Sequence, residues 1–221
     1  MPKPPAILAL AAVDTECSVA YCPANGSAVQ LQQARVRSGG EVLAPLLRDL
    51  LHNNAIDPKT IAGIAAHCGP GSFTGMRVTL AAAQALGQAW DAPVLGIPYH
   101  AAVALALPKP ARLRKTILVA TPSGKDDWHV AVLDAMGKIL YPPTVQPQPH
   151  CPENLAAENL LWLGPGAALG QSHSGGEVYG EKLPEVDAAA IGAYAQVFWQ
   201  MRDTLVPEAL YLRGAAVTVA A

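Results

Sequence analysis

The chain has 221 residues, of which 51% are hydrophobic and 14% are charged, and its formal net charge is −2. This apolar content is ample for a substantial core in one or two compact lobes. A protein that binds nucleic acid by itself usually carries a broad basic surface that neutralises phosphates, and the overall charge excludes a footprint of that size. Any contact with RNA is therefore expected to be local or to be supplied by a partner.

The N-terminal apolar stretch, residues 6–13, is too short to span a membrane, and Asp14 follows it before a cleavage region could form. We therefore expect a cytoplasmic protein that has no contact with a membrane. The cysteines form no CxxC pair and no dense scaffold, which favours free thiols in a reducing compartment. They are Cys17, Cys22, Cys68 and Cys151.

The first half of the chain predicts three strands followed by alternating helices and strands. Apolar runs and a turn at residues 23–26 indicate the three strands, and leucines at helical spacing indicate the first helix. The predicted strands are 6–13, 17–21, 28–35, 61–67 and 94–97, and the predicted helices are 41–52, 74–90 and 101–107.

The second half predicts a shorter version of the same order. The predicted strands are 116–121, 128–134, 138–141 and 160–163, and the predicted helices are 154–159 and 188–205. Residues 164–184, which are rich in Gly, Ser and His, predict a loop or connector. Two similar units indicate a duplicated α/β architecture with a mixed sheet in each of two lobes. The boundary is expected at Pro108-Lys109-Pro110, which gives lobes of residues 1–107 and 108–221.

The strongest local signal is a Gly-rich turn between the strand that ends at His67 and the helix that ends at Trp90. Its residues are Gly69, Pro70, Gly71, Ser72, Phe73, Thr74 and Gly75, and Arg77 follows two residues later. Exposed N–H groups at a helix N-terminus can bind an anion. The same glycines can equally serve close packing of strand on helix, with Thr74 as the N-cap. The sequence leaves both interpretations open.

Three better-known motifs do not fit this turn. A P-loop requires a Lys after its last glycine, and a nucleophile elbow requires Gly-x-Ser-x-Gly; neither spacing is present. The dinucleotide fingerprint is closest, but the spacing is one residue too long. Asp91 also precedes its strand instead of ending it, so nicotinamide binding is not expected.

The stretch GPGSFTGMRVTLAAAQALG followed by PVLGIPYHAAVA resembles the signature region of the TsaB (YeaZ-like) family, formerly grouped with M22-like glycoproteases. Shorter segments are also similar to that family, densely before Leu107 and sparsely after it. These are residues 7–10 and 17–20 for the opening hairpin, 37–47 for the first helix, 163–167 for a second Gly-rich turn, and Leu210-Tyr211-Leu212-Arg213 near the end.

The resemblance implies an actin-like (ASKHA) fold of two ribonuclease-H-like lobes. It also implies a role in forming threonylcarbamoyladenosine beside the anticodon of tRNA. In that pathway TsaD transfers the group, TsaE joins as an ATPase, and TsaB is the non-catalytic scaffold that pairs with TsaD through its N-terminal lobe. The chain would then contact tRNA indirectly, through the complex, and would form a homodimer when alone.

Departures from the family pattern lower the expectation of independent catalysis. Ala11-Ala12 stands where family members carry Asp-Thr, and Pro122 stands where they often carry Asp. Neither an alanine nor a proline side chain can ligate Mg²⁺, so no cofactor and no metal is expected. The histidines, which form no HExxH or HxxxH pair, are expected at the surface or the core edge. They are His52, His67, His100, His129, His150 and His173.

No nucleophile–base pair is evident in the sequence either. The alternative function, an autonomous nucleotide-binding phosphotransferase or protease of the actin-like or M22-like class, would need such a pair or phosphate-loop carboxylates.

Two helices are expected to form the partner interface. The helix over 41–52 has leucines on more than a narrow stripe, and the helix over 74–90 is small and apolar on most faces. A helix that is apolar all round requires burial on both sides, and small side chains permit close helix packing. The predicted contact residues are Leu43, Leu46, Leu47, Leu50, Arg77, Leu80, Ala81, Gln84 and Ala85.

Overall fold

The computed structural model describes residues 3–13, 15–25, 29–35, 41–124, 126–155 and 159–210. The chain divides into two compact units, each built around a five-stranded mixed sheet. Unit 1 comprises the residues up to Ala106 together with Pro184–Leu210, and unit 2 runs from Leu107 to Leu183.

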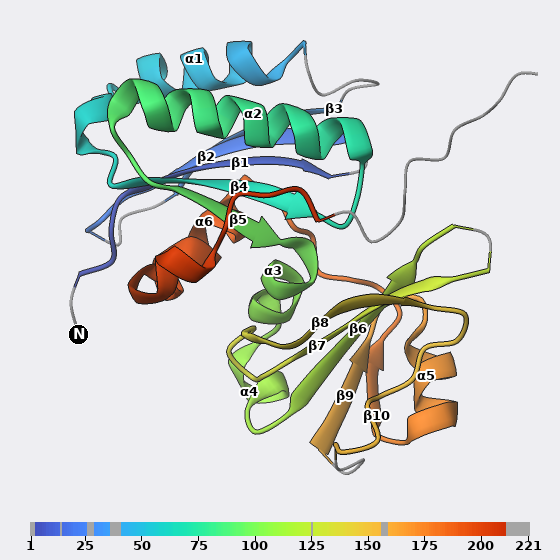
Figure 1. Ribbon diagram of the computed structural model, residues 1–221. Helices are drawn as coiled ribbons and strands as arrows, with labels where there is room; N and C mark the ends of the chain where they lie inside the picture. The colour runs from blue at the N-terminus through green and yellow to red at the C-terminus, as the bar shows by residue number, and fades with distance from the viewer. Residues whose placement is uncertain are drawn as a thin grey trace, which may run out of the picture. The chain divides into compact units, whose positions relative to one another are not determined.

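Unit 1 begins with an antiparallel meander and continues with alternating helices and strands (Figure 1). Its strands are β1 (Ile7–Val13), β2 (Glu16–Cys22), β3 (Gln30–Arg35), β4 (Gly63–Gly69) and β5 (Val94–Pro98). Its helices are α1 (Leu43–Asn53), α2 (Phe73–Trp90), α3 (Tyr99–Ala106) and α6 (Ala188–Val197), with short 3-10 helices η1 (Pro58–Thr60) and η3 (Trp199–Thr204).

The sheet of unit 1 has the strand order β3-β2-β1-β4-β5. β2 is antiparallel to β1 and β3, whereas β4 is parallel to both β1 and β5. The central strands β1 and β4 are buried along almost their whole length, as their continuous apolar runs predict. Helices therefore cover both faces of this sheet.

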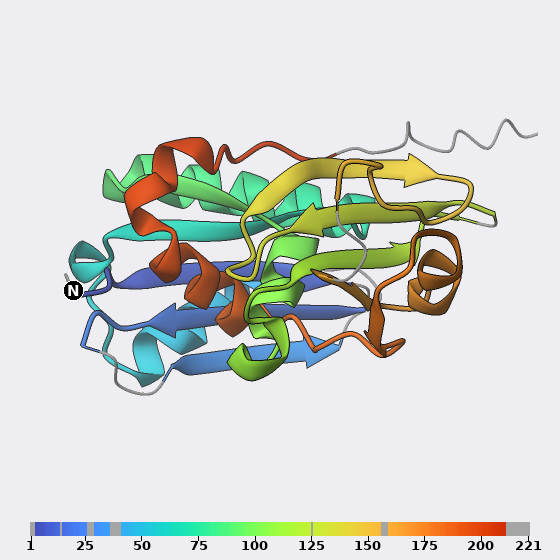
Figure 2. The same cartoon turned by 90° about the horizontal axis from the view of Figure 1, so that it is seen from below.

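α1 and α2 cover one face of the sheet, with α1 over β2 and β3 and α2 over β1 and β4. Leu50 of α1 and Ala83 of α2 join one apolar cluster with Leu8, Leu10 and Ile64 of the strands. α6 packs on the opposite face against β1, β2 and β4, with α3 beside it. Figure 2 shows α6 lying across the strands of the unit 1 sheet.

Unit 2 repeats the sheet topology of unit 1. Its strands are β6 (Thr116–Pro122), β7 (Trp128–Leu133), β8 (Ile139–Gln146), β9 (Leu160–Leu163) and β10 (Glu177–Gly180), and its helices are α4 (Lys109–Arg112) and α5 (Ala167–Ser174). The strand order is β8-β7-β6-β9-β10. β6, β7 and β8 form an antiparallel meander, and β9 and β10 lie on the other side of β6, parallel to it. This is the order found in unit 1, so the duplicated α/β, actin-like architecture predicted from the sequence is confirmed.

The segment predicted as a loop, residues 164–184, contains α5 and β10. That prediction was wrong because tertiary packing outweighs the Gly-rich composition. The Trp162 ring lies on Gly170 of α5, where an added Cβ atom would be 2.3 Å from Cζ3. The Trp162 indole N–H also donates to the Gly175 carbonyl at 2.9 Å. No helix is found at 153–155, and the rest of the predicted helix 154–159 lies largely outside the described residues.

The last predicted helix, 188–205, is also corrected. α6 ends at Val197, the 3-10 helix η3 follows, and both belong to unit 1 and not to the second lobe. The Ala188 N–H donates to Ser18 Oγ at 2.9 Å, and Gln196 donates to the Pro5 carbonyl at 2.8 Å. These bonds attach α6 to the first unit.

The four cysteines are free and buried, as expected for reduced thiols. Burial, with Asp187 nearby, raises the pKa of Cys22 to about 12. Among the described residues, no helix combines the length and the apolar character needed to cross a membrane.

Candidate functional site

The Gly-rich turn joins the end of β4 to the start of α2. Ser72 is the N-cap, and its Oγ accepts a hydrogen bond from the Gly75 N–H at 3.2 Å. The sequence placed the cap at Thr74, which instead lies inside the first turn and is exposed. The helix starts one residue earlier than predicted because the Ser72 side chain satisfies an N–H group that the first turn leaves free.

Two glycines of this turn occupy positions of very close approach. An added Cβ atom on Gly75 would lie 3.0 Å from Ala12 Cβ at the end of β1. Gly69 has φ +105°, and a Cβ atom there would lie 2.3 Å from Met76 Sδ. The first turn of α2 is therefore held tightly against β1, which supports the packing interpretation of the glycines.

His67 lies beneath the turn and is completely buried. Burial lowers its pKa to about 4, so the imidazole is neutral at pH 7. The edge of the ring faces Gly71, where a Cβ atom would be 3.2 Å from Cε1, and Tyr99 packs edge-on with ring centroids 6.1 Å apart. The backbone of His67 is also fixed, because Thr79 Oγ1 of α2 donates to its carbonyl at 3.2 Å.

The segment after η3 binds beside the same turn. The Leu210 N–H donates to the Cys68 carbonyl at 2.7 Å, and the Gly96 N–H donates to the Leu205 carbonyl at 2.9 Å. Gln84 of α2 donates to the Pro207 carbonyl at 3.3 Å. No sequence pattern predicted this contact, apart from the family-like residues that begin at Leu210. The remainder of that motif, Tyr211 to Arg213, lies outside the described residues.

The predicted contact residues divide into a buried and an exposed set. Leu43, Leu50 and Leu80 are 4%, 0% and 5% exposed and belong to the core of unit 1. These three side chains stabilise the lobe and form no exposed surface, which corrects their proposed role. Leu46 and Leu47 are half-buried against the same core.

The exposed set forms a stripe along α2. Its members are Arg77, Ala81, Gln84 and Ala85. Their spacing of four, seven and eight residues from Arg77 places them on one face of the helix. At the N-terminal end of the stripe, the Arg77 guanidinium lies over the Phe73 ring, 3.9 Å from its centroid. Phe73 is 39% exposed, so this end of α2 presents an aromatic ring and a cation together. We call Phe73 and these four residues the α2 stripe.

Known proteins resemble this chain in sequence and in fold. Residues 36–139 match the family model described as TsaD, tRNA N6-adenosine threonylcarbamoyltransferase. The tRNA threonylcarbamoyladenosine biosynthesis protein TsaB of Haemophilus influenzae is 33% identical over 102 residues, which are 45% of this chain and 43% of that protein.

Two solved structures from Pseudomonas aeruginosa have the same fold. A protein described as similar to the peptidase YeaZ superimposes with a TM-score of 0.71 at 22% identity, over 95% of this chain and 100% of the other. YeaZ itself gives 0.69 at 22% identity, over 94% of this chain and 100% of the other. Together the matches show that the chain has the fold of YeaZ and that part of its sequence resembles TsaB.

The sequence match to TsaB spans less than half of that relative, whereas the structural match to YeaZ spans the whole fold. The stretch matched by the family model, 36–139, contains α1, the Gly-rich turn and α2. The α2 stripe thus lies within the part of the chain that most resembles known proteins.

The structure brings together one pair of residues that the sequence analysis missed. Ser123 Oγ and His129 Nε2 lie 2.7 Å apart, across the hairpin between β6 and β7. Burial lowers the pKa of His129, so this is a hydroxyl beside a neutral imidazole, as in a nucleophile–base pair. Ser123 is only 6% exposed, however, so its hydroxyl is largely closed to solvent. The pair therefore resembles a bond that closes the hairpin.

The two positions at which the family resemblance leads us to expect carboxylates carry Ala11 and Pro122. Ala11 is 1% exposed, and Pro122 ends β6. In unit 2 the Trp128 ring covers Gly166, where a Cβ atom would be 2.7 Å from Cε3. These residues do not fit a metal–nucleotide, since they offer no ligand oxygen and an indole occupies the surface of the second Gly-rich turn. No group of three metal-ligating side chains is found within the described residues.

Proposed function

We propose that the chain is a non-catalytic subunit that pairs with a TsaD-type transferase during formation of threonylcarbamoyladenosine in tRNA. The similarity to TsaB and the match to the TsaD family model support this role. A TsaE-type ATPase would be the further partner, and tRNA would be the substrate of the complex. Without the TsaD-type subunit, the chain would pair with a second copy of itself.

The observation that carries the proposal is the α2 stripe. Ala81 and Ala85 are exposed and small, so a helix of another chain can approach the α2 backbone closely. Gln84 and Arg77 flank these alanines with groups that can hydrogen-bond at the edge of such a contact. An exposed helix face with small residues at its centre and polar ones at its rim is suited to helix-on-helix docking.

The Gly-rich turn determines where this face lies. Ser72 caps α2, and Gly75 allows its first turn to contact Ala12, so the helix can neither slide nor tilt without breaking a cap or a packing contact. The contribution of the subunit would be to present a rigid helix face that stabilises the active conformation of its partner. The absence of carboxylates at Ala11 and Pro122 agrees with catalysis by the partner.

Light scattering on size-exclusion chromatography tests the proposal, with the chain alone and mixed with the TsaD-type subunit of the same organism. We expect a heterodimer from the mixture. Ala81→Glu places a long charged side chain at the centre of the stripe, where it blocks the close approach of another helix, and should abolish the complex. Ala62→Glu, at an exposed position just before β4, is the matched control and should leave it intact. A heterodimer that forms equally well with Ala81→Glu would show that the α2 stripe is not the interface.

A second measurement separates this role from an autonomous enzyme. The chain alone, incubated with ATP and Mg²⁺, should release no phosphate above the buffer background. In a reconstituted reaction it should be required for modification of tRNA by the transferase. Phosphate release by the chain alone would instead favour the enzymatic alternative. In that case a substitution such as Ser123→Ala should abolish the release in a variant purified in the same way.

A further inference from the structure

Unit 2 carries a local concentration of positive charge that the proposed pairing does not use. Within residues 109–115, four of the seven side chains are cationic and none is acidic, in a chain with only 15 Lys and Arg among 221 residues. Lys138 lies in the neighbouring turn between β7 and β8. We call this set the basic corner; it comprises Lys109, Arg112, Arg114, Lys115 and Lys138.

Arg112 holds the basic corner together. Its Nε donates to the Leu107 carbonyl at 3.0 Å, which fixes the side chain against the start of α4. Its Nη1 donates to the Ala135 carbonyl and lies 3.9 Å from Met136 Sδ. α4 is therefore fastened to the β7–β8 turn, and this places Lys138 on the same corner as the α4 residues.

The β7–β8 turn is itself well ordered by hydrogen bonds. Asp134 Oδ1 accepts from the Met136 N–H at 2.8 Å and from the Lys138 N–H at 2.9 Å. This carboxylate is thus engaged by the backbone of the turn. The position of the Lys138 backbone is fixed, and its ammonium group is exposed.

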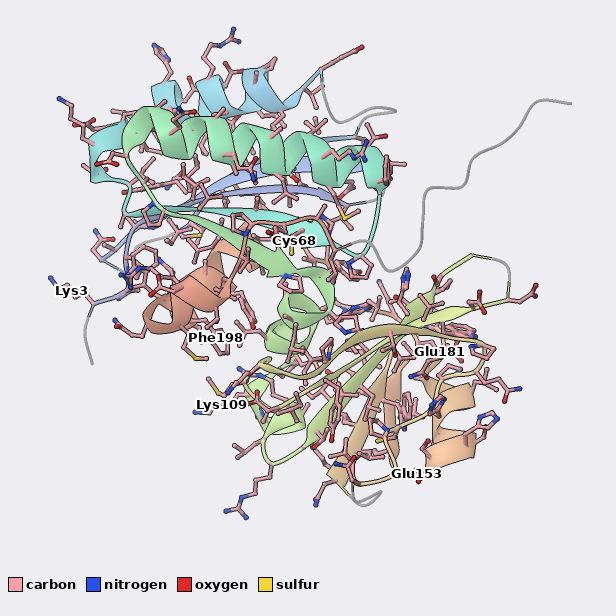
Figure 3. All side chains as sticks on the ribbon, in the orientation of Figure 1. Lys3, Cys68, Lys109, Glu153, Glu181 and Phe198 are labelled. Atoms are coloured by element: carbon pink, nitrogen blue, oxygen red, sulfur yellow. The ribbon has the colours of Figure 1, made fainter. Side chains whose placement is uncertain are left out.

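Most of the charge in the basic corner is not neutralised by neighbours. Lys115 pairs with Glu177 at 3.0 Å. Lys109, Arg114 and Lys138 are exposed and form no ion pair within the described residues. The partners of Arg112 are uncharged, two carbonyl groups and the Met136 sulfur atom, so its charge also remains. Lys109 points away from the sheet of unit 2 (Figure 3).

We propose that the basic corner binds the phosphate backbone of tRNA. This inference rests on the proposed function, which makes tRNA the polyanion that the complex must hold. Three exposed cations on a fixed frame can contact successive phosphates, and such contacts position a nucleic acid without reading its sequence. The basic corner gathers a few cations at one place on the surface, so RNA binding there is compatible with a formal net charge of −2 for the whole chain. It lies on unit 2, whereas the α2 stripe lies on unit 1.

RNA suits this corner better than a membrane surface does. α4 is a single turn of four residues, and the exposed apolar side chains beside it are Leu113 at 56% and Met136 at 49%. Two isolated apolar side chains provide little area for insertion into lipid, whereas peripheral helices bury a continuous apolar face. The same two side chains can pack on a ribose or a base next to the bound phosphates.

The test compares two triple variants with equal loss of charge. The first neutralises the corner with Lys109→Gln, Arg114→Gln and Lys138→Gln. The control carries Lys3→Gln, Lys59→Gln and Lys182→Gln, at three exposed lysines elsewhere. Binding of an unmodified tRNA transcript is measured by fluorescence anisotropy as a function of salt, for the chain alone and for its complex with the TsaD-type subunit.

Each phosphate contact contributes about 0.7 to 0.9 to the slope of log affinity against log salt. We expect the corner variant to lower the steepness of this slope by about 2 and the control variant to leave it unchanged. Both variants should still form the heterodimer. If the salt dependence of tRNA binding falls equally in the two variants, binding depends on net charge and the proposal is wrong. The proposal is also wrong if the wild-type chain and its complex bind tRNA no better than the corner variant does.

Two further outcomes separate this proposal from the proposed function. If the complex forms and modifies tRNA with the same KM for the wild type and the corner variant, the corner is not a tRNA site and the pairing stands. If no complex forms but the chain alone binds tRNA through the corner, the pairing fails and the corner stands. Binding to vesicles of anionic phospholipid in place of tRNA, lost in the corner variant, would assign the surface to a membrane and overturn the RNA proposal.

Discussion

The imidazole of His67 lies against Gly71, with Cε1 only 3.2 Å from the position that a Cβ atom on Gly71 would occupy. The ring is completely enclosed between this glycine and the edge of the Tyr99 ring. Protonation at this position would place a charge in an apolar enclosure directly under the turn that starts α2. The histidine therefore couples the stability of the turn to pH.

The folded protein should lose stability as the pH falls below 6.5. Burial lowers the pKa of His67 from 6.5 to about 4 in the folded state, so the unfolded chain binds a proton first. The contribution of neutral His67 to the unfolding free energy is fully present above pH 6.5 and is lost as the pH falls from 6.5 towards 4. At pH 5 this difference in pKa lowers the unfolding free energy by about 2 kcal/mol. Urea unfolding between pH 7.5 and pH 5 measures it.

The variant His67→Leu isolates this contribution from the other titrating groups. Its unfolding free energy should depend less steeply on pH between 6.5 and 5 than that of the wild type, whatever its absolute stability. His129, whose pKa is also lowered by burial, contributes with the same sign and remains in both proteins. His52→Gln, at an exposed site, is the matched control and should retain the wild-type pH dependence. Identical pH dependences in His67→Leu and the wild type would contradict this assignment.

Ser72→Ala should destabilise the chain by about 1 kcal/mol, because it removes the side-chain acceptor of the Gly75 N–H. Thr74→Ala, two residues later in the exposed first turn, should cost less than about 0.5 kcal/mol. Chemical denaturation of the two variants side by side distinguishes the cap seen in the structure from the one that the sequence suggested. A larger loss for Thr74→Ala would reverse that conclusion.

Gly192→Ala should destabilise unit 1 by about 1–3 kcal/mol through overpacking. A Cβ atom on Gly192 would lie 2.4 Å from Cys22 Sγ and 3.2 Å from Ala9 Cβ, so α6 would have to move away from β1 and β2. The double variant with Cys22→Ala removes the sulfur atom. In the Cys22→Ala background, Gly192→Ala should lower the free energy of unfolding in urea clearly less than it does in the wild type. Additive losses would argue against direct contact between α6 and β2.

The strands and helices of unit 1 were accessible from the sequence because their patterns are simple. β1 and β4 are continuous apolar runs flanked by turns, and α1 repeats leucine at helical spacing. Their boundaries shift by at most two residues, as at β4, which was expected over 61–67 and spans Gly63–Gly69. The meander and the repeated order of elements were sufficient to predict the duplicated fold.

The errors arise where long-range packing outweighs composition. Residues 164–184 look like a connector, yet the Trp162 ring on Gly170 and the bond to Gly175 organise α5. Nothing in the sequence of α6 indicates which sheet it covers. That choice depends on Ser18 and on carbonyls near the N-terminus, about 170 residues away.

At the candidate site, the sequence predicted partner contacts on both α1 and α2, and the structure shows which of these residues are exposed. Leucine spacing in α1 marked Leu43 and Leu50 as contact residues, although an amphipathic helix uses such residues to bind its own sheet. The exposed residues of the same prediction, Arg77, Ala81, Gln84 and Ala85, all lie on α2. Ser123 and His129 were missed because they meet only through the register of the β6–β7 hairpin.

Leu50 lies in the core of unit 1 and Ala85 lies on the exposed α2 stripe, so substitutions at the two positions should affect stability and pairing separately. Leu50→Ala removes a side chain that is 0% exposed within the core of unit 1 and should cost about 2–5 kcal/mol of unfolding free energy. At a temperature where the variant remains folded, its affinity for the TsaD-type subunit should stay close to the wild-type value. Ala85→Glu lies on the exposed stripe, so it should change the unfolding free energy by less than about 0.5 kcal/mol and yet prevent pairing. Urea unfolding and light scattering on the same preparations measure both effects. If folded Leu50→Ala loses pairing while Ala85→Glu retains it, then the leucines of α1, and not the stripe on α2, contact the partner.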